Sequence, residues 1–302
     1  MGYDLAPILV TGASGYLGRR VINALCLARV PHVATSRRGV VGDACDLTDA
    51  SAVKHLMTHH RPSAVIHCAA IVPSCPADYC DESMAHTTVT IARHVFDNAR
   101  CRVVLASSMT VYGGSPDVPV GEDAPCAPAA GYARGKWLVE QALFEHGAQG
   151  DVALRLPGLF GLPRRTGLLY KAARAFLDSD RFECTIADVP WAAITVDDAA
   201  AYLARAAILP LGAPPQVVNV GYRGEYSAID AVAHVAKCCG IAWVPPTLRS
   251  RTFSIDLSRL ESLYGGPPAS LRQRLETFVD SIRRDRQRLG AEEGIPRRDD
   301  AT

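Results

Sequence analysis

The chain has 302 residues, 48% of them hydrophobic and 21% charged, which predicts one large or two coupled globular domains. Its 32 lysines and arginines are balanced by 31 aspartates and glutamates, so the charge gives no reason to expect nucleic acid or a membrane surface as a partner. A basic leader with a long apolar core is missing, as is any apolar run of about 18 residues. We therefore expect a cytoplasmic protein without a membrane span.

The ten cysteines are scattered along the chain. They form neither a Cys-x-x-Cys pair nor a cluster with histidines at ligand spacing. In a cytoplasmic chain this distribution favours free thiols that act as small buried hydrophobic residues. We expect no metal site.

The first predicted elements lie in the stretch PILVTGASGYLGRR, where a β-branched run precedes three glycines at a spacing of three, Gly12, Gly15 and Gly18. Apolar residues then recur at helical intervals, which predicts strand, tight turn and helix. Gly12 would allow the turn, Gly15 would let the backbone approach a pyrophosphate, and Gly18 would let helix and strand pack closely. The pattern favours a dinucleotide cradle at a helix N-terminus, although a plain structural turn also uses such glycines.

A second strand is predicted over Val33 to Ser36, followed by Arg37 and Arg38. An acidic residue at this strand end would bind the 2′-hydroxyl of NAD, and none is present. A serine followed by two arginines instead favours the 2′-phosphate of NADP, with NAD still open. The alternative is that both arginines are only solvated.

Strands and helices then alternate up to residue 156. We predict a helix over Asp49 to His60, a strand from Ala64 into Ala70, a helix over Ser83 to Ala99 and a strand over Arg102 to Ala106. This alternation is typical of a parallel, doubly wound α/β sheet. Its ligand crevice lies beyond the carboxyl ends of the strands.

Three residues suited to proton transfer follow. Ser108 ends the strand that begins at Arg102, and Tyr132 and Lys136 open a helix four residues apart, so they share one face. A nearby ammonium favours a phenolate, so we expect Lys136 to lower the pKa of Tyr132. Such a tyrosine can exchange a proton with an alcohol or ketone while hydride moves to or from a nicotinamide, with Ser108 bonded to the same oxygen.

Together these residues resemble the extended short-chain dehydrogenase/reductase superfamily, in its NAD(P)-dependent epimerase/dehydratase branch. The resemblance rests on TGASGYLG, GDACDL, VIHCAA, SSMTVYG, YARGK and LRLPGLFG, and further on ITVDDAAAYL and VVNVGYRGEYSAIDAVAHVA. It implies that Tyr132 is the acid/base, that Lys136 is its partner and a ribose ligand, and that Ser108 binds substrate. The cofactor-binding residues that it implies are Gly12, Gly15, Tyr16, Leu17, Gly18, Asp46, Leu47, Ala69 and Ala70, beside Ser36, Arg37 and Arg38 at the second strand end.

The resemblance further implies a Rossmann domain over residues 1–156, with returning segments at about 191–220, and a smaller, discontinuous substrate domain over 157–190 and 221–288. Residues 289–302 are expected to be a disordered tail. In this half we predict helices over Thr166 to Leu177, Asp197 to Ile208, Ser227 to Cys239, Ser254 to Tyr264 and Ser270 to Arg286, and strands over Phe182 to Ile186 and Val217 to Val220.

The residues after the catalytic serine bear on the reaction. Sugar 4,6-dehydratases carry Asp-Glu there, whereas this chain has Met109 and Thr110, so we predict no dehydratase activity. Two functions remain. The first is a keto-reductase or alcohol dehydrogenase that uses NADP, and Arg37 and Arg38 favour it. The second is a 4-epimerase with tightly bound NAD. A non-catalytic dinucleotide-binding protein is a third, but it predicts a broken Ser/Tyr/Lys set.

Nucleotide sugars are the substrates that the resemblance implies, with a sugar acid or a polyketide-like ketone as smaller alternatives. The chain departs from the family pattern at three positions, His86, Gly158 and Trp191. The substrate contacts expected are Ser108, Met109, Gly158, Trp191 and Arg249, and a diphosphate contact could also come from Arg251, Arg164 or Arg165. Trp191 could equally be core packing. A homodimer is implied, through the helices over Ser83 to Ala99 and Tyr132 to His146.

Overall fold

The computed structural model describes residues 6–114, 118–179, 181–184, 190–209, 212–246 and 251–292, without the side chains of 290–292. Its main sheet has seven strands in the order β3-β2-β1-β4-β5-β6-β9, and every neighbouring pair is parallel. Their bounds are β1 Ile8–Thr11, β2 His32–Ser36, β3 Asp43–Ala44, β4 Ala64–His67, β5 Arg102–Ser108, β6 Val152–Leu156 and β9 Gln216–Asn219. The predicted parallel α/β sheet is confirmed.

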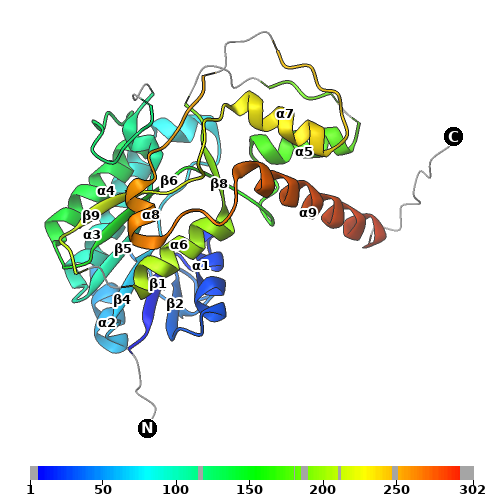
Figure 1. The fold of residues 1–302 in the computed structure, drawn as a ribbon. Coiled ribbons are helices and arrows are strands. Elements are labelled where there is room, and N and C mark those ends of the chain that lie inside the picture. Colours follow the sequence, from blue (N-terminus) through cyan, green and yellow to red (C-terminus); the bar gives the residue numbers. More distant parts are fainter. Residues whose placement is uncertain are drawn as a thin grey trace.

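Helices cover both faces of this sheet (Figure 1), namely α1 Tyr16–Leu27 and α6 Val196–Ile208 on one face, and α2 Ala50–His60, α3 Glu82–Asn98 and α4 Tyr132–His146 on the other. Neighbouring strand residues point to opposite faces, so Val10 packs in the core beneath α1 and α6 while Leu9 packs beneath α2 and α3. Burial on both sides explains why the strands read as continuous apolar runs.

The strand order reverses between β1 and β4, because the chain moves outward from β1 to β3 and then returns to begin again at β4. At such a reversal the loops beyond the two neighbouring strands diverge and leave a crevice at their carboxyl ends. The glycine turn after β1 and the segment after β4 therefore face each other across this crevice.

Elements from the second half of the chain form a smaller layer beyond that end of the sheet (Figure 1). Strands β7 Gly158–Phe160 and β8 Ala193–Thr195 pair in parallel, and helices α5 Leu168–Leu177, α7 Ala228–Cys238 and α9 Leu271–Glu292 pack on one another. Edge-to-face contact of Phe160 with Phe278, centroids 5.2 Å apart, joins β7 to α9. Helix α8 Ser258–Tyr264 packs against β9 and α6.

Three predictions in this half need correction. Residues 182–184 form no strand, since the Phe182 carbonyl accepts from the Trp243 indole, while 185 and 186 lie outside the described residues. The predicted Ser254 helix begins only at Ser258, because Phe253 and Ile255 form β-bridges with Tyr226 and Val120. Helix α9 continues to Glu292, into the predicted tail, of which 293–302 lie outside the described residues.

Candidate active site

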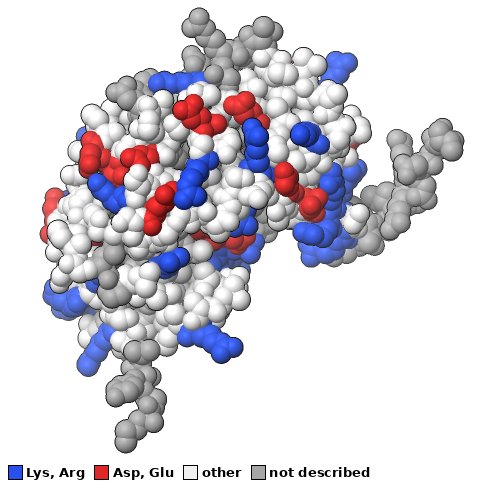
Figure 2. Space-filling view, in the orientation of Figure 1, with Lys and Arg blue, Asp and Glu red and all other residues white. Residues whose placement is uncertain are grey.

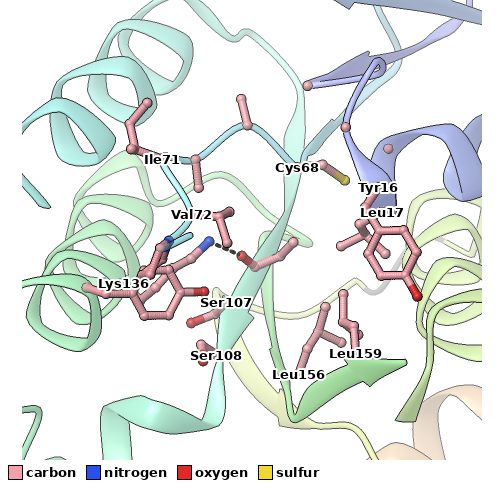
Figure 3. Close-up of a pocket in the computed structure, with 18 of the residues that line it drawn as sticks. Tyr16, Leu17, Cys68, Ile71, Val72, Ser107, Ser108, Lys136, Leu156 and Leu159 are labelled. Carbon is pink, nitrogen blue, oxygen red and sulfur yellow. Dashed lines mark hydrogen bonds between the residues drawn. The ribbon is translucent and has the colours of Figure 1, made fainter. Parts of the chain in front are cut away.

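A pocket of about 820 Å³ opens at the carboxyl ends of β1, β4 and β5. Figure 3 shows Lys136, Ser107 and Ser108 on one side of it and Tyr16 and Leu17 on the opposite side. The pocket brings together segments that are far apart in the sequence, from the glycine turn to Phe253. Asp46 is its one carboxylate among the described residues.

The glycine turn has the geometry of a phosphate cradle. Gly12 has a φ of +67°, and a Cβ on it would lie 2.8 Å from the Ala69 backbone, so only glycine fits there. A Cβ on Gly18 would lie 2.2 Å from the Gly12 carbonyl oxygen, so α1 packs directly on the turn. A Cβ on Gly15 would meet only that same oxygen, at 3.1 Å, and Gly15 lines the pocket.

The N-terminus of α1 is also free to receive an anion. Its N-cap, Gly15, has no side chain to cap the first turn, and that turn contains no acidic residue. The unpaired N–H groups and the positive end of the helix dipole favour a phosphate at this place. Tyr16 and Leu17 line the pocket there, as do Ala69 and Ala70 across the turn. The residues thus fit the pyrophosphate of a dinucleotide.

The end of β2 forms another part of the pocket wall. Ser36 and Arg37 line the pocket, whereas Arg38 is exposed and is not among the described lining residues. The Ser36 hydroxyl donates to the Val41 carbonyl oxygen at 3.0 Å and accepts from the Val41 N–H at 3.2 Å, so it holds its own turn. Arg37 is therefore the cation that faces the pocket at this end.

Asp46 and Leu47 line the same end of the pocket. Asp46 accepts from the Thr48 N–H and hydroxyl, at 3.0 and 2.7 Å. These hydrogen bonds, together with the Arg37 charge, lower the pKa of Asp46. The carboxylate is thus ionised and fixed beside Arg37.

Tyr132 and Lys136 stand at the start of α4, one turn apart, and both line the pocket with Ser108. The Lys136 ammonium donates to the Ala106 carbonyl oxygen at 2.9 Å and lies 5.9 Å from the centre of the Tyr132 ring. Ser108 caps the short 3₁₀ helix Met109–Tyr112 and accepts from the Thr110 hydroxyl at 3.0 Å. Two elements therefore bring the three predicted residues to one wall.

The pKa of Tyr132 does not move in the direction expected from Lys136. The pKa of Tyr132 is raised to about 12, mainly by burial and then by Tyr79, while the hydrogen bond with Ser108 and the Arg164 charge oppose the rise. Burial also lowers the pKa of Lys136 to about 8, although Cys68 and Glu140 favour its charged form. In this structure Tyr132 is a neutral phenol at neutral pH, and Lys136 keeps most of its charge.

Behind this wall lies a buried ion pair. Glu140 follows Lys136 by one turn on α4, is fully buried, and accepts from Arg155 of β6 at 2.7 Å. Ser107, the neighbour of Ser108, donates its hydroxyl to Glu140, and the Arg155 guanidinium stacks 4.6 Å from the centre of the Tyr112 ring.

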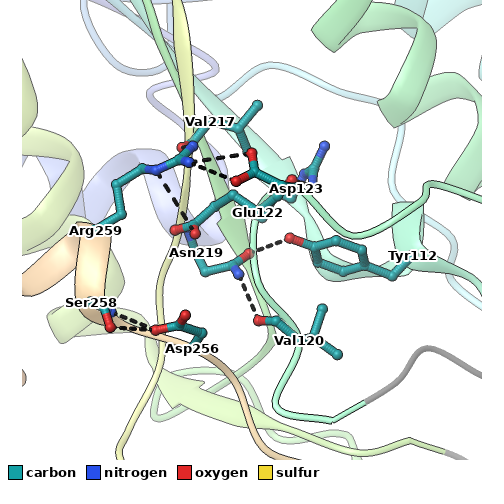
Figure 4. Close-up of polar contacts among 10 residues, drawn as sticks. Tyr112, Val120, Glu122, Asp123, Val217, Asn219, Asp256, Ser258 and Arg259 are labelled. Carbon is teal, nitrogen blue, oxygen red and sulfur yellow. Dashed lines mark hydrogen bonds and ion pairs between the residues drawn. The ribbon is translucent and has the colours of Figure 1, made fainter.

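The ion pair continues into a polar network around β9, shown in Figure 4. The Tyr112 hydroxyl donates to the Asn219 side-chain oxygen at 2.7 Å, and the Asn219 amide donates to the Val120 carbonyl oxygen at 3.0 Å. Glu122 accepts from the Asn219 N–H, and Arg259 pairs with Asp123 at 3.3 Å. The network fixes the backbone that follows Ser108.

The predicted substrate contacts divide into two groups. Ser108, Met109 and Gly158 line the pocket. Trp191 does not, since its neighbours Pro190 and Ala192 form that part of the wall while the indole packs against the core. Arg249 lies outside the described residues.

Several pocket residues had not been predicted. Cys68 follows β4, and Val72 and Tyr79 lie in the segment between β4 and α3. The Tyr79 ring contacts the Tyr132 ring edge-on, with centroids 5.8 Å apart. Cys68 lies inside the strand predicted from Ala64 into Ala70, whereas β4 ends at His67, and its place next to the predicted cofactor residues Ala69 and Ala70 could have revealed it. Tyr79 and the distant Phe253 carry no periodic signal.

Two features are absent from the described part of the chain. No three His, Cys, Asp or Glu side chains there are grouped so that they could hold a metal ion. No helix there combines the length and apolar character needed to cross a membrane.

On the face drawn in Figure 2, acidic and basic side chains are intermingled.

Among curated proteins, the chain is 33% identical over 156 residues to the UDP-glucose 4-epimerase of Azospirillum brasilense. The matched stretch covers 47% of this chain and 44% of that protein. It is 28% identical over 186 residues to the dTDP-4-keto-6-deoxy-D-glucose reductase of Streptomyces niveus, covering 61% and 62% of the two chains. The matched stretches thus span about half of these relatives.

Solved structures share the fold over nearly the whole chain. The UDP-glucose 4-epimerase of Thermotoga maritima, solved with UDP-glucose, superposes with a TM-score of 0.75 at 18% identity, over 92% of this chain and 99% of that one. MoeE5, solved with UDP-glucuronic acid and NAD, gives 0.76 at 24% identity, over 92% and 99%. Residues 8–221, more than half of the chain, match the sequence model described as the NAD dependent epimerase/dehydratase family. The chain belongs to this family.

Proposed function

We propose that this protein is an NADP(H)-dependent reductase that reduces a keto carbon of a nucleotide sugar. The observation that carries the proposal is the shared pocket, in which Ser108, Tyr132 and Lys136 stand on one wall and the glycine turn stands opposite. A proton donor and a dinucleotide cradle in one crevice are what reduction of a carbonyl needs.

The protonation states support the direction of reduction. When bound, a nicotinamide cofactor would supply the hydride. Tyr132 is a neutral phenol at neutral pH, because burial raises its pKa to about 12, so it can donate its proton to the oxygen of the reduced carbonyl. Ser108 stands at the same wall to hold that oxygen, and the Lys136 ammonium favours the phenolate that Tyr132 becomes.

The cofactor preference rests on the end of β2. Arg37 lines the pocket where a dinucleotide places its adenosine ribose, and the residue that ends β2 there is Ser36 rather than an acid. A guanidinium at this place can neutralise a 2′-phosphate, which favours NADP(H) over NAD(H).

A second candidate is a 4-epimerase that keeps NAD bound, and the match to the Azospirillum brasilense UDP-glucose 4-epimerase favours it. The match to the Streptomyces niveus keto-reductase covers more of this chain, at lower identity. The two functions differ in whether the cofactor is consumed. A reductase consumes one NADPH for each product, whereas an epimerase regenerates its NAD in every cycle.

One experiment separates these functions. The purified protein is mixed with NADPH and dTDP-4-keto-6-deoxyglucose, and NADPH consumption is followed. In parallel, UDP-glucose is added without cofactor, and UDP-galactose is measured. We expect stoichiometric NADPH consumption in the first assay and no product in the second. The reverse result would identify the epimerase, and NADPH binding without turnover in either assay would favour a dinucleotide-binding protein.

We also propose the division into a Rossmann domain over 1–156 with returning segments at 191–220, and a substrate domain over 157–190 and 221–288. The mutual packing of α5, α7 and α9 supports it. A homodimer through α3 and α4 is a further proposal, which light scattering in solution tests. The cytoplasmic location stays a prediction, to be checked by cell fractionation.

A further inference from the structure

The Ser108 hydroxyl, which the proposed reaction uses to hold the substrate oxygen, is already bonded to a neighbour in its own segment. Its Oγ accepts from the Thr110 N–H at 3.2 Å and from the Thr110 hydroxyl at 3.0 Å. A serine hydroxyl has two acceptor positions and one hydrogen to donate. Thr110 therefore fills both acceptor positions, and the hydrogen of Ser108 is left for another partner.

That hydrogen is directed at the proton donor of the site. The hydrogen bond between Ser108 and Tyr132 lowers the pKa of Tyr132. A hydrogen bond lowers the pKa of a phenol when the phenol oxygen accepts it, because it then stabilises the phenolate. Ser108 is thus the donor of this bond. A carbonyl oxygen placed beside the two hydroxyls would accept from Ser108 in the same way.

The backbone that carries Thr110 is fixed at both ends. Thr110 lies in the short 3₁₀ helix Met109–Tyr112, which begins at its N-cap Ser108. At the other end, the buried Tyr112 side chain donates to the Asn219 side-chain oxygen at 2.7 Å. The Thr110 side chain is exposed and lines the pocket. The short helix therefore holds the Thr110 hydroxyl against Ser108 before a ligand binds.

We propose that Thr110 is a positioning residue, which keeps the Ser108 hydroxyl turned so that it donates to the reacting carbonyl oxygen. The inference rests on the proposed function, and it applies equally to a 4-epimerase, since both reactions interconvert a carbonyl and an alcohol. It assigns Ser108 the role of a hydrogen-bond donor and not that of a relay that takes up the Tyr132 proton.

The benefit of this arrangement is electrostatic. The carbonyl oxygen gains negative charge during reduction, before or while it takes the proton of Tyr132. A donor that is oriented beforehand stabilises this charge without reorganisation of the site. The hydrogen bond that Ser108 accepts from the Thr110 hydroxyl also polarises Ser108 and strengthens its own donation.

The test uses the full chain with Thr110→Val, which keeps the side-chain shape and removes the hydroxyl, and with Thr110→Ser, which restores it. The values of kcat and KM are measured with whichever substrate the wild type turns over, the keto sugar with NADPH or UDP-glucose. We expect Thr110→Val to lower kcat roughly tenfold, while KM and NADPH affinity stay within about twofold. Thr110→Ser should recover most of the rate.

The matched control is Thr58→Val. Thr58 is also exposed, and its hydroxyl donates to the Lys54 carbonyl oxygen of α2 at 2.8 Å, outside the described pocket lining. This variant loses one threonine hydroxyl with a similar bond, so it should turn over like the wild type.

A double variant shows whether Thr110 acts through Ser108. Ser108→Ala should lower kcat by roughly 10²- to 10³-fold. Addition of Thr110→Val to Ser108→Ala should then slow the enzyme by no more than about twofold, because the group that Thr110 orients is already missing. A wild-type rate for Thr110→Val, or a double variant about tenfold slower than Ser108→Ala, would overturn the inference.

Neutron diffraction from deuterium-exchanged crystals of the wild type tests the orientation without any turnover. We expect the Thr110 deuteron to lie on the line to the Ser108 oxygen and the Ser108 deuteron to be directed at the Tyr132 oxygen. A Ser108 deuteron directed at Thr110 would overturn the inference and leave the proposed function standing. A wild type that turns over neither substrate, with both deuterons as expected, would overturn the proposed function and leave the orientation of Ser108 supported.

Discussion

The Lys136 ammonium lies 5.9 Å from the centre of the Tyr132 ring and donates to the carbonyl oxygen of Ala106 in β5. Both side chains come from one face of α4 and line the pocket, Lys136 buried and Tyr132 half-buried. The phenol is therefore a neutral proton donor next to a cation that is held in place by the sheet. Most of the expected properties of the site follow from this pair.

Tyr132→Phe removes the proton donor and little else, because the ring keeps its edge contact with Tyr79. We expect turnover to fall by roughly 10²- to 10⁴-fold, with NADPH affinity unchanged. Steady-state rates and fluorescence titration measure the two effects. Tyr79→Phe is the control, since it keeps the aromatic contact and should turn over within a few-fold of the wild type. Wild-type turnover by Tyr132→Phe would remove this residue from the mechanism.

The charge of Lys136 predicts the alkaline limb of the pH profile. Because burial lowers its pKa to about 8, the ammonium is lost as the pH rises through that value, and the phenolate of Tyr132 loses its stabilising neighbour. We expect turnover to fall above about pH 8 in wild-type protein. A rate that stays flat up to pH 10 would contradict this assignment.

The same pKa shift makes a prediction for stability. The ordinary pKa of a lysine is 10.5, so between about pH 8 and pH 10.5 the unfolded chain binds a proton at Lys136 that the folded chain lacks. The free energy of unfolding therefore gains on the order of 3 kcal/mol from this group as the pH rises through that window. Lys136→Met lacks the gain, so the free energy of unfolding of the wild type, measured in urea, should rise relative to that of the variant between pH 7 and pH 10 by most of this amount. A difference that does not depend on pH would contradict the shift.

The fold could be read from the sequence where local patterns decide the structure. The glycine turn, the four-residue spacing of Tyr132 and Lys136 and the alternation of strands and helices all depend on neighbours within one element. The raised pKa of Tyr132 could not be predicted from the sequence, because part of the rise comes from Tyr79, which lies in a segment without periodicity. The strand predicted over residues 182–184 is wrong for a similar reason, since the indole of Trp243, about sixty positions away, donates to the Phe182 carbonyl oxygen.

Arg37→Gln tests the cofactor preference. We expect it to weaken NADPH binding on the order of tenfold or more and to leave NADH binding nearly unchanged, because only NADPH carries the 2′-phosphate. Arg38→Gln is the matched control, since Arg38 is exposed and outside the described pocket lining. Fluorescence titration with both cofactors measures this. Equal losses for NADH and NADPH would argue against a phosphate contact.

The buried ion pair behind the site predicts a large difference between two glutamates of the same helix. Glu140 is fully buried and accepts from Arg155 and Ser107, whereas Glu145 is 62% exposed in its pair with Arg93. Removing one partner of a buried pair leaves a charge without compensation inside the protein, so Glu140→Gln should lower the free energy of unfolding by about 3–5 kcal/mol. Glu145→Gln should cost less than about 1 kcal/mol, because solvent screens an exposed pair. Urea unfolding of both variants at neutral pH measures the contrast, and equal stability of the two would show that Arg155 finds another partner when Glu140 is lost.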